Sequence, residues 1–126
     1  MTVNYLGHFE GAEQFGCNAG RKMVYVDAFG EVSPCVFTPM SFGSVRDRAL
    51  PEIWADMRPR FPSSSRCFMN TNYRLFAART GETLPLAPES SRALAAAAEF
   101  APPGRFMERL EAVSYTHLTL PTNREV

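Results

Sequence analysis

The sequence predicts one small α+β domain, in which a β-hairpin is followed by short helices. Residues 23–36 contain two stretches rich in β-branched and aromatic residues, separated by a turn. Residues 50–61 then place apolar side chains at helical spacing, and residues 88–100 are rich in alanine. A chain of 126 residues has room for about one domain, so these elements should share one core.

The hairpin is predicted from its alternation and from its turn. In "KMVYVDA", Met23, Tyr25 and Asp27 alternate with two valines, which is typical of a strand. "DAFG" has Asp at the first turn position and Gly30 at the fourth, which favours a type I turn closing on a left-handed glycine. Pro34 cannot donate a ladder hydrogen bond, so the second strand should end there or lie at an edge.

Four helical segments are expected after the hairpin. Pro51 suits the first turn of a helix and Pro59 should stop it. A second short helix is expected around residues 73–76, a third at 88–100 capped by Ser90 or Ser91, and a fourth from residue 102. The aromatic and apolar residues expected to pack rather than to bind ligands are Tyr25, Phe29, Leu50, Ile53, Trp54 and Met57.

The C-terminal residues change character abruptly at "VSYTHLTLPTNREV". This string resembles the translation of a transposon-end sequencing adapter, so Val113–Val126 is left out of the fold prediction. We expect the tail to be exposed or irregular and to make few contacts with residues 17–67. Tyr115 and His117 are accordingly expected to carry no function, and the natural C-terminus is expected to be missing.

Composition excludes several classes of function. Thirteen basic residues balance thirteen acidic ones, so no basic excess favours nucleic acid. No stretch is long and apolar enough to predict a membrane span, and the N-terminus lacks the pattern of a signal peptide. A cytoplasmic location is therefore expected, where thiols stay reduced. Three cysteines are an odd number for a disulfide framework and favour a metal site instead.

The cysteines follow the spacing C-x12-G-x4-C, with a third cysteine after the first predicted helix. A hairpin brings its two ends together, so Cys35 should lie near Cys17, and the chain has room to fold Cys67 back toward them. Three convergent thiolates suit a thiophilic metal centre. Gly16 and Gly20 flank Cys17 and should let backbone amides approach a sulfur.

At these residues the chain resembles the C-terminal auxiliary-cluster domain of radical S-adenosylmethionine enzymes, called SPASM, or twitch when abbreviated. The resemblance covers "GCNAGRKMVYVDAFGEVSPC", "SFGSV", "LPEIW" and "RC", in that order. It implies that Cys17, Cys35 and Cys67 ligate a [4Fe–4S] cluster. The further cysteines of a full SPASM pattern are absent after Cys67, so the match is twitch-like, with an iron left open to substrate or a cluster that relays electrons.

The resemblance also implies a larger parent enzyme. The C-x3-C-x2-C motif of the catalytic cluster and a β/α-barrel of about 200 residues or more are absent from this sequence. The chain is therefore expected to be a fragment that is not catalytic alone. S-adenosylmethionine and a peptide or small-molecule substrate would bind the parent enzyme. The expected divisions are an entering segment (1–16), the cluster domain (17–80), a truncated helical extension (81–112) and the adapter-like tail (113–126).

Other interpretations of the same residues remain open. Three cysteines plus one histidine make a closed zinc set, with His8 as the candidate histidine, so the alternative is a zinc- or thiol-stabilised interaction module without catalysis. Arg21 and Lys22 either offset cluster charge, contact an anionic substrate or are solvated cations. Asp27 is expected to be a turn residue and not a catalytic acid.

Overall fold

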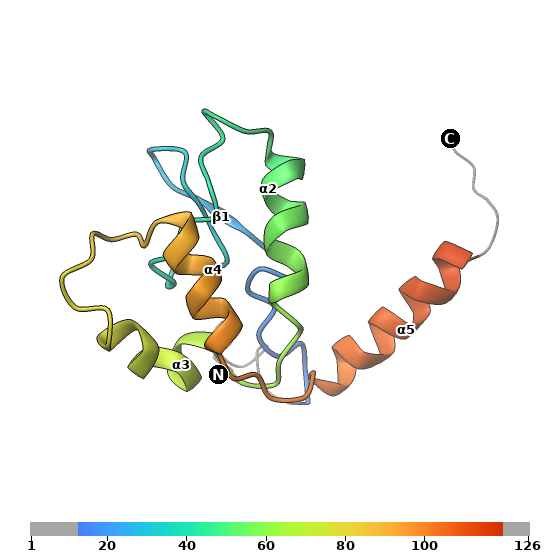
Figure 1. Ribbon diagram of the computed structural model, residues 1–126. Coiled ribbons are helices and arrows are strands. Elements are labelled where there is room, and N and C mark those ends of the chain that lie inside the picture. The colour runs from blue at the N-terminus through green and yellow to red at the C-terminus, as the bar shows by residue number, and fades with distance from the viewer. Residues whose placement is uncertain (1–12, 120–126) are drawn as a thin grey trace, which may run out of the picture.

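The computed structural model describes residues 13–119, with side chains described as far as residue 113 (Figure 1). In this range a two-stranded antiparallel sheet precedes four α-helices, so the α+β prediction is confirmed. The elements, in order, are β1 (Tyr25–Val26), β2 (Val32–Ser33), α2 (Leu50–Met57), the 3-10 helix η1 (Arg58–Arg60), α3 (Phe68–Ala77), α4 (Pro88–Ala97) and α5 (Arg105–Thr119).

The hairpin turn forms as its sequence predicts. Asp27 Oδ1 accepts hydrogen bonds from the backbone N–H of Phe29 (2.8 Å) and of Glu31 (2.9 Å). Gly30 has φ of 90° and donates its N–H to the carbonyl of Asp27 at 3.0 Å. Asp27 is therefore a turn residue, because its carboxylate satisfies the backbone of the loop.

The strands are shorter than the predicted range of 23–36. Tyr25 pairs with Ser33, and β2 ends there, immediately before Pro34, as expected. On its other side β2 is covered by a loop, since Val32 donates to the Gly43 carbonyl and accepts from the Phe42 N–H, each at 2.9 Å. Val32 is consequently fully buried, whereas β1 is partly exposed.

Helix α2 buries most of the apolar face that was predicted for it. Ile53 and Met57 are completely buried, and Trp54 packs against the core. Leu50, at the first turn, remains 39% exposed. The expectation that Phe29 packs is wrong: it is 73% exposed, because the tight turn directs it away from the domain.

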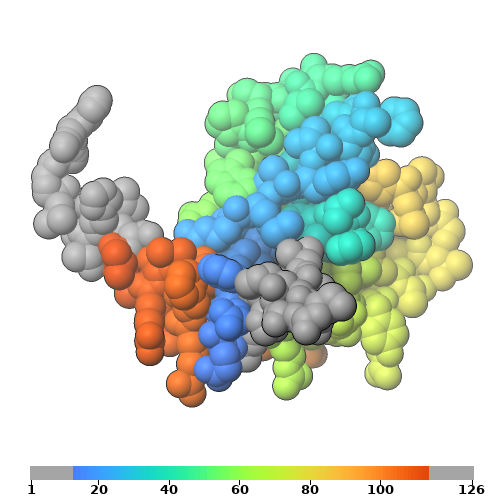
Figure 2. Space-filling view, turned by 180° about the vertical axis from the view of Figure 1, so that it is seen from behind, coloured from blue at the N-terminus to red at the C-terminus, as the bar shows by residue number. Residues whose placement is uncertain are grey.

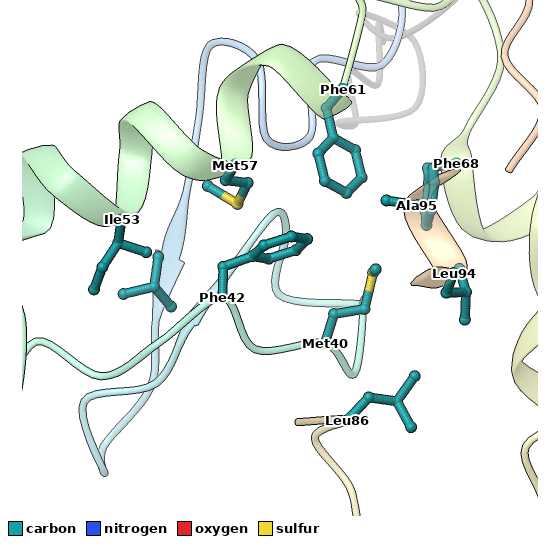
Figure 3. Close-up of a cluster of buried hydrophobic side chains, with 10 residues drawn as sticks. Met40, Phe42, Ile53, Met57, Phe61, Phe68, Leu86, Leu94 and Ala95 are labelled. Carbon is teal, nitrogen blue, oxygen red and sulfur yellow. The ribbon is translucent and has the colours of Figure 1, made fainter. Parts of the chain in front are cut away.

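Phe61 lies at the centre of the aromatic core (Figure 3). Its ring meets those of Phe42, Phe68 and Phe100 at centroid distances of 5.6, 5.3 and 6.1 Å. These residues come from four separate segments of the chain. Edge-to-face contacts of this kind stabilise a core beyond the area they bury, so Phe61 joins the cysteine-bearing loops to the helices.

The later helices pack on the same core. α3 is longer than the predicted segment, and α4 begins at Pro88 without the expected serine cap, because Ala87 occupies the cap position and Ser91 lies inside the helix. Ser91 is buried and donates its hydroxyl to the Leu86 carbonyl. The core includes Leu86, Leu94 and Ala95 from the segment expected to be an extension, so that segment contributes to the main body.

The last helix, α5, leads away from this body (Figure 1). Met107 near its start is buried, whereas Val113 is 64% exposed, as expected for the tail. The tail was expected to be exposed or irregular, and α5 continues into it as a helix as far as Thr119, because no proline or glycine interrupts the helix there. Residues 120–126 of the tail lie outside the described residues. Between residues 13 and 119 no helix has the length and apolar character needed to cross a membrane.

Candidate metal centre

Cys17 is fixed by backbone pairing with the segment that precedes Cys67. Its N–H donates to the Ser64 carbonyl at 2.6 Å, and the Ser64 N–H donates back to the Cys17 carbonyl at 3.0 Å. Two reciprocal hydrogen bonds define an isolated antiparallel bridge. The first and third cysteines, fifty residues apart in sequence, therefore come from adjacent pieces of backbone.

The two glycines beside Cys17 permit this close approach. Gly16 has φ of 67°, and a Cβ at this position would collide with the Ser64 carbonyl oxygen. Gly20 has φ of 72°, and its Cβ would lie 2.7 Å from Phe61 Cγ. The predicted importance of these glycines is therefore explained by backbone conformation and by contact with the core, since only glycine adopts such φ values without strain.

Cys35 is held by its own turn after the hairpin. Its N–H donates to Thr38 Oγ1 at 3.0 Å, and the Thr38 hydroxyl donates to the Cys35 carbonyl at 2.8 Å. The Gly20 N–H donates to the carbonyl of Pro34 at 3.0 Å, which joins this turn to the loop that follows Cys17. The hairpin thus brings its two ends together, as the sequence predicts.

Cys67 is exposed and occupies the N-cap position of α3. The first N–H groups of a helix lack intrahelical partners, and the helix dipole places partial positive charge there. Negative charge close to this end of a helix, such as that of a bound anionic group, is favoured by both effects. Sequence reasoning missed this arrangement, because cysteine is not a usual capping residue and no serine, threonine, asparagine or aspartate marks the start of the helix.

The pKa of the Cys17 thiol responds to its burial and to both other cysteines. Partial burial raises the pKa of the Cys17 thiol, and backbone hydrogen bonds with Ala19 and Phe68 oppose that effect. Charge on Cys67 and on Cys35 raises the Cys17 pKa further. Both of these cysteines therefore lie within electrostatic range of Cys17. The amide that approaches the sulfur from the flanking loop is that of Ala19 and not that of either glycine.

The described residues contain no compact group of metal ligands. Among them no three cysteine, histidine or carboxylate side chains are close enough together to hold one metal ion. All three cysteines are free thiols, and two N–H groups already approach one sulfur. His8, the candidate zinc ligand, lies outside the described residues.

Arg21 and Lys22 are engaged in ion pairs and are not a solvated pair of cations. Arg21 Nε lies 3.1 Å from Glu111 Oε2, and Lys22 Nζ lies 3.6 Å from the same oxygen. Glu111 belongs to α5, ninety residues away from Arg21 in sequence. This contact was not predicted, because nothing in the sequence relates α5 to the loop after Cys17.

The hairpin, the bridge between Cys17 and Ser64 and the start of α3 bring three cysteine-bearing segments together in one small domain. Residues 17–75 match the family described as SPASM, an iron–sulfur cluster-binding domain. The predicted resemblance is thereby confirmed, and the match includes all three cysteines and extends beyond Cys67 to residue 75. No curated protein and no solved structure matched the chain.

Proposed function

We propose that this chain supplies an auxiliary [4Fe–4S] module to a radical S-adenosylmethionine enzyme, with Cys17, Cys35 and Cys67 as the cluster ligands. The observation that carries the proposal is the environment of Cys17. Its sulfur receives backbone hydrogen bonds from Ala19 and Phe68 and lies within electrostatic range of the other two thiols. These residues all fall inside the SPASM segment.

Each ligand would be positioned by a different element of the fold. Cys17 is held by its bridge to Ser64, and Cys35 by the Thr38 turn. Cys67 begins α3, where the helix dipole favours a negatively charged group beside it. The amides of Ala19 and Phe68 would lower the electron density on the Cys17 sulfur, and such contacts tune the potential of a cluster.

A cluster with three thiolate ligands has one iron without a cysteine. That iron would bind substrate, accept another side chain or serve only in electron relay. These 126 residues contain three cysteines and no C-x3-C-x2-C motif, so cleavage of S-adenosylmethionine would belong to a separate catalytic segment. The substrate, a peptide or a small molecule, would meet the module there.

Anaerobic reconstitution of the full chain with iron and sulfide tests the proposal. The product should be brown and hold about four irons per chain. Cys67→Ala should lose most of this iron, whereas Ser65→Ala, a nearby change of similar size, should retain it. A colourless chain that binds one zinc would support the zinc-stabilised interaction module instead, and equal iron in both variants would exclude Cys67 as a ligand.

A further inference from the structure

The loop after Cys17 holds a carboxylate between two cations. The guanidinium of Arg21 reaches both oxygens of Glu111, with Nε 3.1 Å from Oε2 and Nη2 3.4 Å from Oε1. Lys22 Nζ approaches Oε2 at 3.6 Å. A planar guanidinium fork that meets both oxygens is the geometry by which proteins recognise carboxylates.

Backbone hydrogen bonds that do not involve α5 fix the turn that carries these two cations. The N–H groups of Arg21 and Lys22 both donate to the Asn18 carbonyl at 3.0 Å, in a tight turn one residue after Cys17. Arg58 adds a third cation, since its Nε donates to the Arg21 carbonyl at 3.1 Å. Within the described part of the chain, Glu111 is the carboxylate that pairs with Arg21 and Lys22, so positive charge is in excess there.

Glu111 comes from a helix that lies beside this loop and is joined to the body by a proline-rich link, residues 101–104 (Figure 2). Near the start of α5, Met107 is buried and Phe106 packs on Phe15 with a centroid distance of 4.8 Å. Glu111 lies one turn further along. The side chains of Arg21, Lys22 and Glu111 are 27%, 33% and 27% exposed. Water therefore reaches the ion pair, and another carboxylate can exchange with Glu111.

We propose that Arg21 and Lys22 form a carboxylate-binding site that Glu111 fills from within the chain, and that an acidic group of the substrate displaces Glu111. The proposal rests on the proposed function, because it places this site beside the loop of the cluster ligand Cys17. The substrate of this module would then carry a carboxylate.

The probe for this site is glutamate blocked by an N-acetyl group and a C-terminal amide, which has one carboxylate and the side chain of Glu111. Its control is the blocked glutamine. Binding to the full chain is followed by NMR, at the Nε–H signal of Arg21, and iron content is measured in the same sample. Glu111→Gln should bind the probe about fivefold more tightly than the original chain, because an intramolecular pair of this exposure competes by about that factor.

The matched control is Glu108→Gln, which removes the same charge from an exposed carboxylate of α5 that forms no ion pair with a described residue. It should leave probe affinity unchanged. Adding Arg21→Gln or Lys22→Gln to Glu111→Gln should reduce affinity at least fivefold. Equal tightening by both glutamate variants, equal binding of blocked glutamine, or tighter binding of inorganic phosphate would overturn the proposal. Failure to load iron would contradict only the proposed cluster function, because the probe reports on the cations.

Discussion

Replacing Gly20 with alanine should destabilise the domain more than its small size suggests. Gly20 has φ of 72°, and an added Cβ would lie 2.7 Å from Phe61 Cγ and 2.8 Å from Cδ2. Left-handed backbone costs an alanine about 1–2 kcal/mol, and crowding of a packed core costs about 1–3 kcal/mol. Reduced freedom of the unfolded chain offsets about 0.4–1 kcal/mol of this. The free energy of unfolding should therefore fall by about 2–4 kcal/mol.

Urea denaturation of the full chain measures this loss, and Gly81→Ala is the matched control. Gly81 also has positive φ, 99°, but no atom lies within 4 Å of its added Cβ. This variant should lose only the backbone cost, about 1 kcal/mol after the offset. The difference between the two variants isolates the contact with Phe61.

A second substitution tests the same contact between residue 20 and Phe61. Phe61→Leu alone should also destabilise the core, but the double variant should lose less than the sum of the two single losses, a partial recovery, because a smaller side chain gives room to the new methyl group. Iron retention should fall in Gly20→Ala, since the Gly20 N–H joins the Cys17 loop to Pro34, the neighbour of Cys35. If Gly20→Ala and Gly81→Ala lose equal stability, with no recovery in the double variant, the contact between Gly20 and Phe61 does not matter.

Two further predictions concern charge and the tail. Partial burial raises the pKa of Asp56, but hydrogen bonds and charge from Arg92 and Arg60 outweigh it and hold the pKa below 3.8. This stabilisation, about 1 kcal/mol, is therefore present above pH 3.8 and lost as pH falls through the lower, folded-state pKa. Asp56→Asn should cost that amount in urea near neutral pH and nothing in strong acid, without added metal; a pH-independent difference would contradict the linkage. Deleting residues 113–126 should change stability by less than about 0.5 kcal/mol and leave iron content unchanged. A loss above about 2 kcal/mol would show that the tail packs on the domain.

The sequence alone determined the features that depend on neighbours in the chain. The hairpin turn follows from Asp27 and Gly30, because a carboxylate and a glycine three positions apart satisfy the same local loop. The buried positions Ile53 and Met57 follow from helical spacing. The three cysteines were identified by spacing and by resemblance, and their segment matches the SPASM family.

The tertiary structure decided the features that join distant segments. No local pattern relates Gly20 to Phe61, Cys17 to Ser64 or Arg21 to Glu111, since each pair meets only after the chain has folded. Helix ends were equally hard to predict, because Cys67 and Ala87 occupy cap positions without a capping side chain. Residue types and short spacings thus determined the helices and the hairpin and identified the three cysteines. Packing around Phe61 decided where the thiols lie, because a side chain from one segment must fill the space that three others leave.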